Sequence, residues 1–136
     1  MIEFKNVSFS YEAGTPVLSD LSFTIADGES VGLIGANGAG KSTIMKAMLG
    51  LLPVQGEVII DGIPVTKKTL PQIRQKLGFV LQNSDNQMFM PTVYEDMRFA
   101  PKNYGLDEAE IETRIDEVLE RLHLTELKYR YNHKIS

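Results

Sequence analysis

The 136-residue sequence contains no cysteine, no long apolar run and no run of basic residues. The absence of cysteine excludes disulfides and thiolate metal sites, and it fits a reducing compartment such as the cytosol. No stretch approaches the roughly 18 consecutive apolar residues of a membrane-spanning helix. The first residues also lack the apolar segment of a secretory signal peptide. We therefore expect a cytoplasmic protein that reaches any membrane only through a partner.

The charge distribution argues against a nucleic-acid-binding protein. The formal net charge is −4, and the 14 lysine and arginine residues are scattered along the chain. Binding to DNA or RNA needs a basic patch that neutralises successive phosphates, so we expect none. Hydrophobic residues make up 43% of the sequence and charged residues 24%, a balance typical of a soluble, folded domain.

The apolar pattern predicts an α/β protein that begins with antiparallel strands. Residues 2–9 alternate apolar and polar side chains, which is typical of a half-exposed strand, and residues 17–25 form a second candidate. Residues 30–34 and 79–81 are more uniformly apolar, so we expect both to be buried strands, as in a parallel sheet. Residues 56–65 contain Asp-Gly at their centre, the residue pair of a type I′ turn, and predict a hairpin.

The helix predictions depend on caps and on apolar spacing. Helices are expected from Lys41 to Gly50 and over residues 70–77. Thr92 has the capping-box spacing to a glutamate three residues later, so a helix begins there, and Asp107 caps the next one. The apolar face of that last helix is expected to contain Ile111, Ile115, Val118, Leu119 and Leu122.

The segment with the clearest chemical function is Gly-Ala-Asn-Gly-Ala-Gly-Lys-Ser-Thr, residues 35–43. It matches the P-loop (Walker A) pattern Gly-x-x-x-x-Gly-Lys-Ser/Thr between a predicted strand and a predicted helix. Its glycines let several backbone amides point into one concavity, where the helix adds its positive N-terminal end. Lys41 would reach the terminal phosphates, Ser42 would bind Mg²⁺, and Thr43 would hydrogen-bond a nearby phosphate oxygen. Further phosphate contacts are expected from Gly35, Asn37, Gly38, Ala39 and Gly40.

Together with its neighbours, this loop resembles the P-loop of the ATP-binding subunits of ABC transporters. Tyr11 stands at the position of the aromatic residue that stacks on adenine in this family, and such stacking is physically favourable. Gln82 stands at the position of the Q-loop glutamine, whose amide contacts Mg²⁺ and the attacking water. The resemblance therefore implies ATP and Mg²⁺ as cofactors, with catalytic roles for Lys41 and Gln82.

The same resemblance implies the fold of an ABC ATPase, which is an α/β P-loop NTPase. Residues 1–136 would form the N-terminal part of its nucleotide-binding domain. This part would comprise an N-terminal antiparallel β subdomain and part of a parallel α/β core, incomplete at the C-terminus. Its landmarks would be the P-loop at 35–43, the Q-loop from Gln82 and a helical region over about residues 92–130.

The sequence ends at Ser136, inside a match to the Leu-Ser-Gly-Gly-Gln motif of the family. The Walker B aspartate, the water-polarising glutamate and the switch histidine of the family follow that motif. Phosphoryl transfer depends on positioned charges, so we expect this chain alone to hydrolyse ATP slowly or not at all. We also expect it to expose apolar surface that further strands would cover.

Residues 81–106 resemble more narrowly the cobalt and energy-coupling-factor (ECF) branch of the family, whose ATPases power the import of metal ions and vitamins. Two positions depart from the usual pattern, because Ser84 stands where proline is usual and Asn86 where aspartate is frequent. Residues 88–90, Met-Phe-Met, fit either a contact with a membrane subunit or the protein core. The implied partners are a second ATPase subunit, identical or different, and integral membrane subunits. The protein would then lie peripherally on the inner face of the cell membrane.

Two other functions fit the same residues. A soluble ABC ATPase of translation or repair would have no transporter partner, although residues 88–97 argue against it. A nucleotide-dependent interaction module would bind ATP without turning it over. His123 and His133 lack partners at the spacing of metal ligands, so we expect no metal site at either residue.

Overall fold

The computed structural model describes residues 1–83 and 86–135 and divides the chain into two compact units, Met1–Gly78 and Phe79–Ser136. Ser84 and Ser136, on which two sequence-based expectations depend, lie outside the described residues. Within the described part, no helix combines the length and the apolar character needed to cross a membrane.

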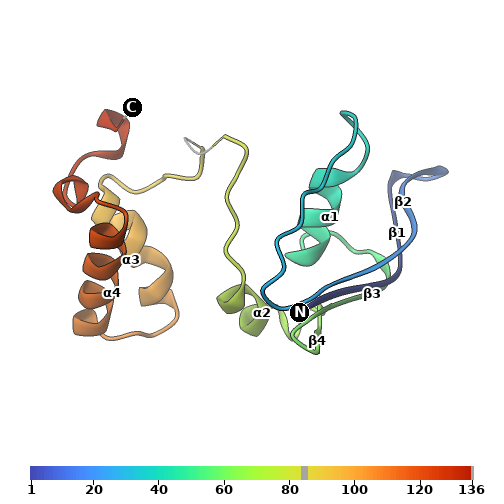
Figure 1. Ribbon diagram of the computed structural model, residues 1–136, viewed down its shortest axis with the longest axis horizontal. Helices are drawn as coiled ribbons and strands as arrows, with labels where there is room; N and C mark the ends of the chain where they lie inside the picture. Colours follow the sequence, from blue (N-terminus) through green and yellow to red (C-terminus); the bar gives the residue numbers. More distant parts are fainter. Residues whose placement is uncertain (84–85, 136) are drawn as a thin grey trace. The chain divides into compact units, whose positions relative to one another are not determined.

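In chain order, the strands and α-helices (Figure 1) are β1 (Ile2–Glu12), β2 (Thr15–Ile25), α1 (Lys41–Met48), β3 (Gln55–Ile60), β4 (Ile63–Pro64), α2 (Leu70–Lys76), α3 (Val93–Asn103) and α4 (Glu108–Arg121).

The first unit is built on an antiparallel sheet with the strand order β2-β1-β3-β4. The two expected N-terminal strands are confirmed, and β1 continues to Glu12. The expected hairpin is also present, as β3 and β4. Asp61 and Gly62 at its tip have φ values of 50° and 76°. Both values are positive, as a type I′ turn requires.

A bulge in β1 brings its backbone close to β3. The β1–β3 register shifts between Lys5 and Ser8, and Asn6 adopts a φ of 50°. Opposite this bulge, Gly56 has a φ of 83°, and a Cβ atom there would lie 2.3 Å from the Asn6 carbonyl oxygen. No side chain fits such a gap, so the sheet requires glycine at this position.

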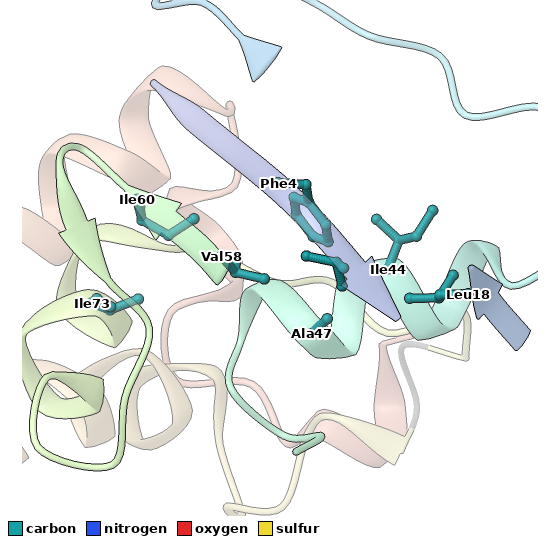
Figure 2. Packing of buried hydrophobic residues seen from close by; sticks show 8 residues of the cluster. Phe4, Leu18, Ile44, Ala47, Val58, Ile60 and Ile73 are labelled. Carbon is teal, nitrogen blue, oxygen red and sulfur yellow. The ribbon is translucent and has the colours of Figure 1, made fainter. Parts of the chain in front are cut away.

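The core of the first unit lies between the sheet and α1, as Figure 2 shows. Phe4 on β1 is 1% exposed and stacks on Phe23 of β2, with ring centroids 4.5 Å apart. Ile44 and Ala47 on α1 are buried in the same cluster. The full set of buried residues in this cluster is Phe4, Val7, Leu18, Ile44, Ala47, Val58, Ile60 and Ile73. This packing fixes the start of α1 relative to the sheet.

The second unit contains the two helices whose caps the sequence predicts. Thr92 and Glu95 form a capping box at the start of α3, and the Asp107 side chain accepts a hydrogen bond from the Glu110 N–H at the start of α4. Ile111, Ile115 and Leu119 are buried, as expected.

The predicted apolar face of α4 was wrong at two positions. Val118 and Leu122 are 44% and 58% exposed. The residues that pack on α4 include Val93, Tyr94 and Met97 of α3 and Leu106. They cover the row of residues spaced by four that begins at Ile111, and Leu122 follows the last residue of the helix. The spacing of apolar residues along a helix indicates a face, but only the neighbouring elements decide how wide the covered part is.

The segment after α4 is held to the helix by Lys128. Its side chain is 10% exposed, and its ammonium donates hydrogen bonds to Glu112 and, at 2.6 Å, to Asp116. The ammonium also lies 5.4 Å from the ring centroids of Tyr94 and Tyr129. The carboxylates of Asp116 and Glu112 raise the pKa of Lys128, and the hydrogen bond to Asp116 contributes most. The Lys128 ammonium in turn lowers the pKa of the Glu112 carboxyl below its usual 4.5, with a smaller contribution from Tyr94.

Glu112→Gln is therefore expected to change the pH dependence of stability in the second unit. A carboxyl with a lowered folded-state pKa stabilises the fold above its unfolded-state pKa, and this contribution disappears as the pH falls through the folded-state value. The variant should be less stable than the wild type at neutral pH, and the difference should shrink at pH values below 4.5. Urea unfolding monitored by circular dichroism over a pH series measures this difference.

The matched control is Glu117→Gln, on the exposed part of the same helix. It should not reproduce the pH-dependent difference. A stability difference between wild type and Glu112→Gln that stays constant from neutral pH to about pH 2 would contradict the assignment.

Two predicted buried strands, residues 30–34 and 79–81, are absent. Both segments are non-helical and pair with no strand within residues 1–83 and 86–135. Ile34 is 95% exposed and Val80 is 78% exposed, so the expected burial was wrong and the expected apolar exposure is confirmed. A strand forms only where a neighbouring segment pairs with its backbone hydrogen-bonding groups, and the described sheet, β2-β1-β3-β4, includes neither segment.

The backbone of residues 79–81 finds a different partner. The side-chain amide of Gln87 donates to the Phe79 carbonyl at 3.1 Å and accepts from the Leu81 N–H at 2.9 Å. These two bonds satisfy the groups that a neighbouring strand would otherwise satisfy. The side chain of Gln87 therefore orders the chain immediately before Gln82.

Candidate functional site

The glycine-rich loop at residues 35–43 connects the exposed segment 30–34 to the first turn of α1. Gly38 and Gly40 have φ values of 85° and 90°, a region that favours glycine. A Cβ atom at residue 40 would lie 3.1 Å from both the Val17 carbonyl oxygen and the Leu18 side chain. A Cβ atom at residue 38 would meet nothing within 4 Å. Gly40 thus packs the loop against β2, whereas the space around Gly38 is open.

The Lys41 side chain folds back over this loop. Its ammonium donates hydrogen bonds to the carbonyl oxygens of Gly35 and Ala36, each at 2.8 Å. An ammonium has three N–H donors, so these two bonds leave a third for an anion. The positive charge is therefore held at the loop by backbone groups.

The first turn of α1 offers donors to the same place. Gly40 is the N-cap of α1 and supplies no capping side chain, and the first turn of this described helix contains no acidic residue. The amides at a helix N-terminus lack partners within the helix and carry a partial positive charge. Ser42 is exposed in this turn, whereas Thr43 is only 4% exposed. The loop, the ammonium and the helix end together form a cradle suited to an anion with several oxygen atoms.

Tyr11 is placed near this cradle at the end of β1. Its side chain is 57% exposed, and its hydroxyl lies 3.4 Å from the Thr43 hydroxyl. The structure therefore places Tyr11 beside Thr43, the last residue of the 35–43 segment, within the first unit. Gln82 is exposed and belongs to the second unit, so its part in the site stays a prediction.

Two residues that shape the site were missed by the sequence reasoning. Phe9 contacts the Tyr11 ring edge-on, with centroids 4.8 Å apart and an angle of 88° between the planes. Val17 contacts the loop at Gly40. The spacing of two between Phe9 and Tyr11 places both on one face of a strand, and this signal could have identified Phe9. No comparable signal marks Val17.

The first unit thus packs an antiparallel sheet on a helix that begins at a loop with the Gly-x-x-x-x-Gly-Lys-Ser pattern of the P-loop class. The sequence profile of the family described as "ABC transporter" matches residues 18–136. The chain belongs to this family, and its fold is that of an ABC ATPase domain.

Several individual relatives are similar over the full length of this chain. It is 47% identical to the energy-coupling factor transporter ATP-binding protein EcfA of Methanothermobacter thermautotrophicus, covering 100% of this chain and 45% of the relative. It is 41% identical to a putative ABC transporter ATP-binding protein of Geobacter sulfurreducens, covering 100% and 55%. The chain thus spans about half the length of these relatives.

Solved structures show the same similarity in three dimensions. CbiO1 from Clostridium perfringens, described as part of the ABC transporter complex CbiONQ, matches with a TM-score of 0.87 and 33% identity, over 99% of this chain and 55% of that one. An ATP-binding cassette in a dimeric, post-hydrolysis state with ADP and Pi matches with a TM-score of 0.82 and 28% identity, over 100% and 63%. Both matches support the expected fold class.

Proposed function

We propose that residues 35–43 bind the triphosphate of ATP together with Mg²⁺. The observation that carries this proposal is the position of the Lys41 ammonium at the loop, beside the uncapped first turn of α1. The third donor of Lys41 would bind the terminal phosphates. The loop residues Gly35, Asn37, Gly38, Ala39 and Gly40 would supply backbone amides to the other phosphate oxygens.

Ser42 is the residue of the first unit that fits a magnesium site. Mg²⁺ prefers oxygen ligands and keeps several bound waters. One protein hydroxyl together with phosphate oxygens therefore suffices to bind it. The Ser42 side chain is exposed at the start of α1 and can present its hydroxyl to such an ion. Bound Mg²⁺ would neutralise phosphate charge. Gln82 is proposed as a further Mg²⁺ and water contact on the family resemblance alone.

The Tyr11 ring is proposed to stack on the adenine base. It is large, more than half exposed and positioned near α1 through Thr43, and flat aromatic rings stack favourably on bases. Thr43 is proposed to bind a phosphate oxygen, and its burial next to Tyr11 means that its hydroxyl must serve both neighbours or exchange between them.

In the complete subunit, we propose ATP hydrolysis that powers the import of a metal ion or vitamin by a cobalt- or ECF-type transporter. Support comes from the relatives named as ECF transporter ATP-binding proteins and from the similarity to CbiO1. Residues 1–136 would be the N-terminal part of the nucleotide-binding domain. The partners would be a second ATPase subunit and integral membrane subunits, with the protein peripheral on the cytoplasmic face of the membrane.

Residues 88–90 supply a candidate contact with the membrane subunits. Met88 and Phe89 are 37% and 63% exposed, which favours an interface over the core as their role. Methionine and aromatic side chains suit adaptable apolar interfaces. Co-purification of the full-length protein with integral membrane subunits would distinguish this function from that of a soluble ABC ATPase.

The direct test of the proposed function is calorimetric titration of the chain with ATP in the presence of Mg²⁺, combined with a phosphate-release assay. We expect saturable binding and little turnover by these 136 residues alone. Absence of ATP binding by the folded chain would contradict the nucleotide site. Turnover as fast as that of a complete ABC ATPase would contradict the expected need for the acidic residues of the other motifs.

A further inference from the structure

Phe9 supports the side chain proposed to bind the base. Both Phe9 and Tyr11 lie on β1, and their rings meet in a T-shaped contact with centroids 4.8 Å apart. Phe9 is half-buried and packs against the core cluster of the first unit, whereas Tyr11 is 57% exposed. The ring of Phe9 therefore connects an exposed aromatic side chain to the rigid part of the fold.

The opposite end of Tyr11 has a second contact. Its hydroxyl lies 3.4 Å from the Thr43 hydroxyl, which is longer than a strong O–H···O hydrogen bond. Thr43 itself is fixed, because it is buried in the first turn of α1. The hydroxyl contact is thus long for a hydrogen bond, and the edge-on contact with Phe9 is a second restraint on the Tyr11 ring.

This part of β1 is paired with β2, but in an irregular register. The pairing of β1 with β2 is irregular at this end, with register shifts between Phe9 and Ser10 and between Ser10 and Glu12. Phe9 pairs with Leu18 across the two strands, and Leu18 is also the residue against which Gly40 packs. Phe9 therefore contacts Tyr11 from the strand pair β1–β2, and the same pair contacts the glycine loop at Gly40.

We propose that Phe9 is a positioning residue that, with Thr43, holds the Tyr11 ring ready to stack on the base of a bound nucleotide. The inference rests on the proposed nucleotide site. An unsupported exposed side chain loses torsional freedom when it binds a ligand, and this loss weakens affinity. A tyrosine that is already restrained loses less, so Phe9 strengthens binding of the base without contacting it.

The experiment compares two ligands, ATP and inorganic tripolyphosphate, each with Mg²⁺, by calorimetric titration of the full chain. Phe9→Leu keeps an apolar side chain but removes the ring contact. It should weaken ATP binding about two- to tenfold and leave tripolyphosphate affinity unchanged. Phe9→Tyr, which keeps an aromatic ring, should bind ATP with the wild-type affinity. Phe9→Met gives a second test if Phe9→Leu does not fold.

The matched control is Phe23→Leu in the same sheet. Phe23 is also half-buried and also pairs with another phenylalanine, Phe4. This variant should leave the ratio of ATP to tripolyphosphate affinity at the wild-type value, because any effect on the sheet acts on both ligands. An equal loss in the control and in Phe9→Leu would overturn the positioning role.

A second readout follows the side chain directly. The sequence contains no tryptophan, so Y11W introduces a single indole whose rotation is measured by time-resolved fluorescence anisotropy. Adding Phe9→Leu to Y11W should increase the amplitude of fast rotation in the ligand-free protein. Unchanged rotation, or an unchanged ATP affinity in folded Phe9→Leu, would overturn the inference. If the wild type binds neither ATP nor tripolyphosphate, the proposed function fails instead.

Discussion

Replacing Lys41 by alanine is expected to weaken ATP binding in the presence of Mg²⁺ by about 10- to 100-fold, the loss of a hydrogen bond to a charged group. The ammonium lies at the loop, held by the carbonyl oxygens of Gly35 and Ala36, and it supplies the only formal positive charge of residues 35–43. Because Gly35 and Ala36 are exposed, water can satisfy both carbonyls in the variant. The thermal stability of the chain should therefore change little. Calorimetric titration with ATP measures the effect.

Lys46→Ala is the matched control for this prediction. Lys46 is an exposed lysine in the last turn of the same helix, α1. It has the same charge and lies on the same helix, but it is in the last turn, where the helix dipole repels phosphate. Its replacement should leave ATP affinity close to that of the wild type. If Lys41→Ala binds ATP as tightly as the wild type does, the proposed phosphate site is wrong.

Gly56→Ala is expected to destabilise the first unit by about 2–4 kcal/mol. The φ of Gly56 is 83°, which strains any other residue. The added Cβ would also lie 2.3 Å from the Asn6 carbonyl oxygen and 2.5 Å from that of Lys5. These are backbone atoms inside a paired strand, so they cannot rotate away as a side chain could. Urea unfolding monitored by circular dichroism measures the loss.

Gly62→Ala separates the two causes of that loss. Gly62 lies in the turn that joins β3 to β4, with a φ of 76° and open space around a hypothetical Cβ. This control carries the backbone strain without the clash, so it should cost only about 1 kcal/mol. Equal losses for the two variants would show that the close approach at Gly56 contributes nothing to the stability of the sheet.

Short-range patterns predicted the local elements of this chain well. The residue pair Asp61-Gly62 requires only two backbone conformations, and the capping box at Thr92 involves residues three apart. Such features are decided by neighbouring residues in the sequence, so they can be inferred before any fold is known. The P-loop pattern belongs to the same kind, because the glycines and Lys41 act within nine consecutive positions.

Features that depend on distant partners could not be predicted in the same way. Residues 30–34 have the composition of a buried strand, yet strand formation needs a second chain segment to accept its hydrogen bonds. The burial of Lys128 depends on Glu112 and Asp116 from another element. Nothing in the sequence near Lys128 indicates that its charge is enclosed.

The sequence by itself determined the family, the P-loop pattern and the positions of the helix caps and hairpin turn, because each depends on residues close together in the chain. Only the tertiary structure decided that Gly56 must be glycine, that Gly40 packs against Val17 and that Phe9 contacts the exposed ring of Tyr11. A position requires glycine, or an aromatic ring is held in place, because of atoms that belong to neighbouring strands. Only packing in three dimensions brings those atoms together.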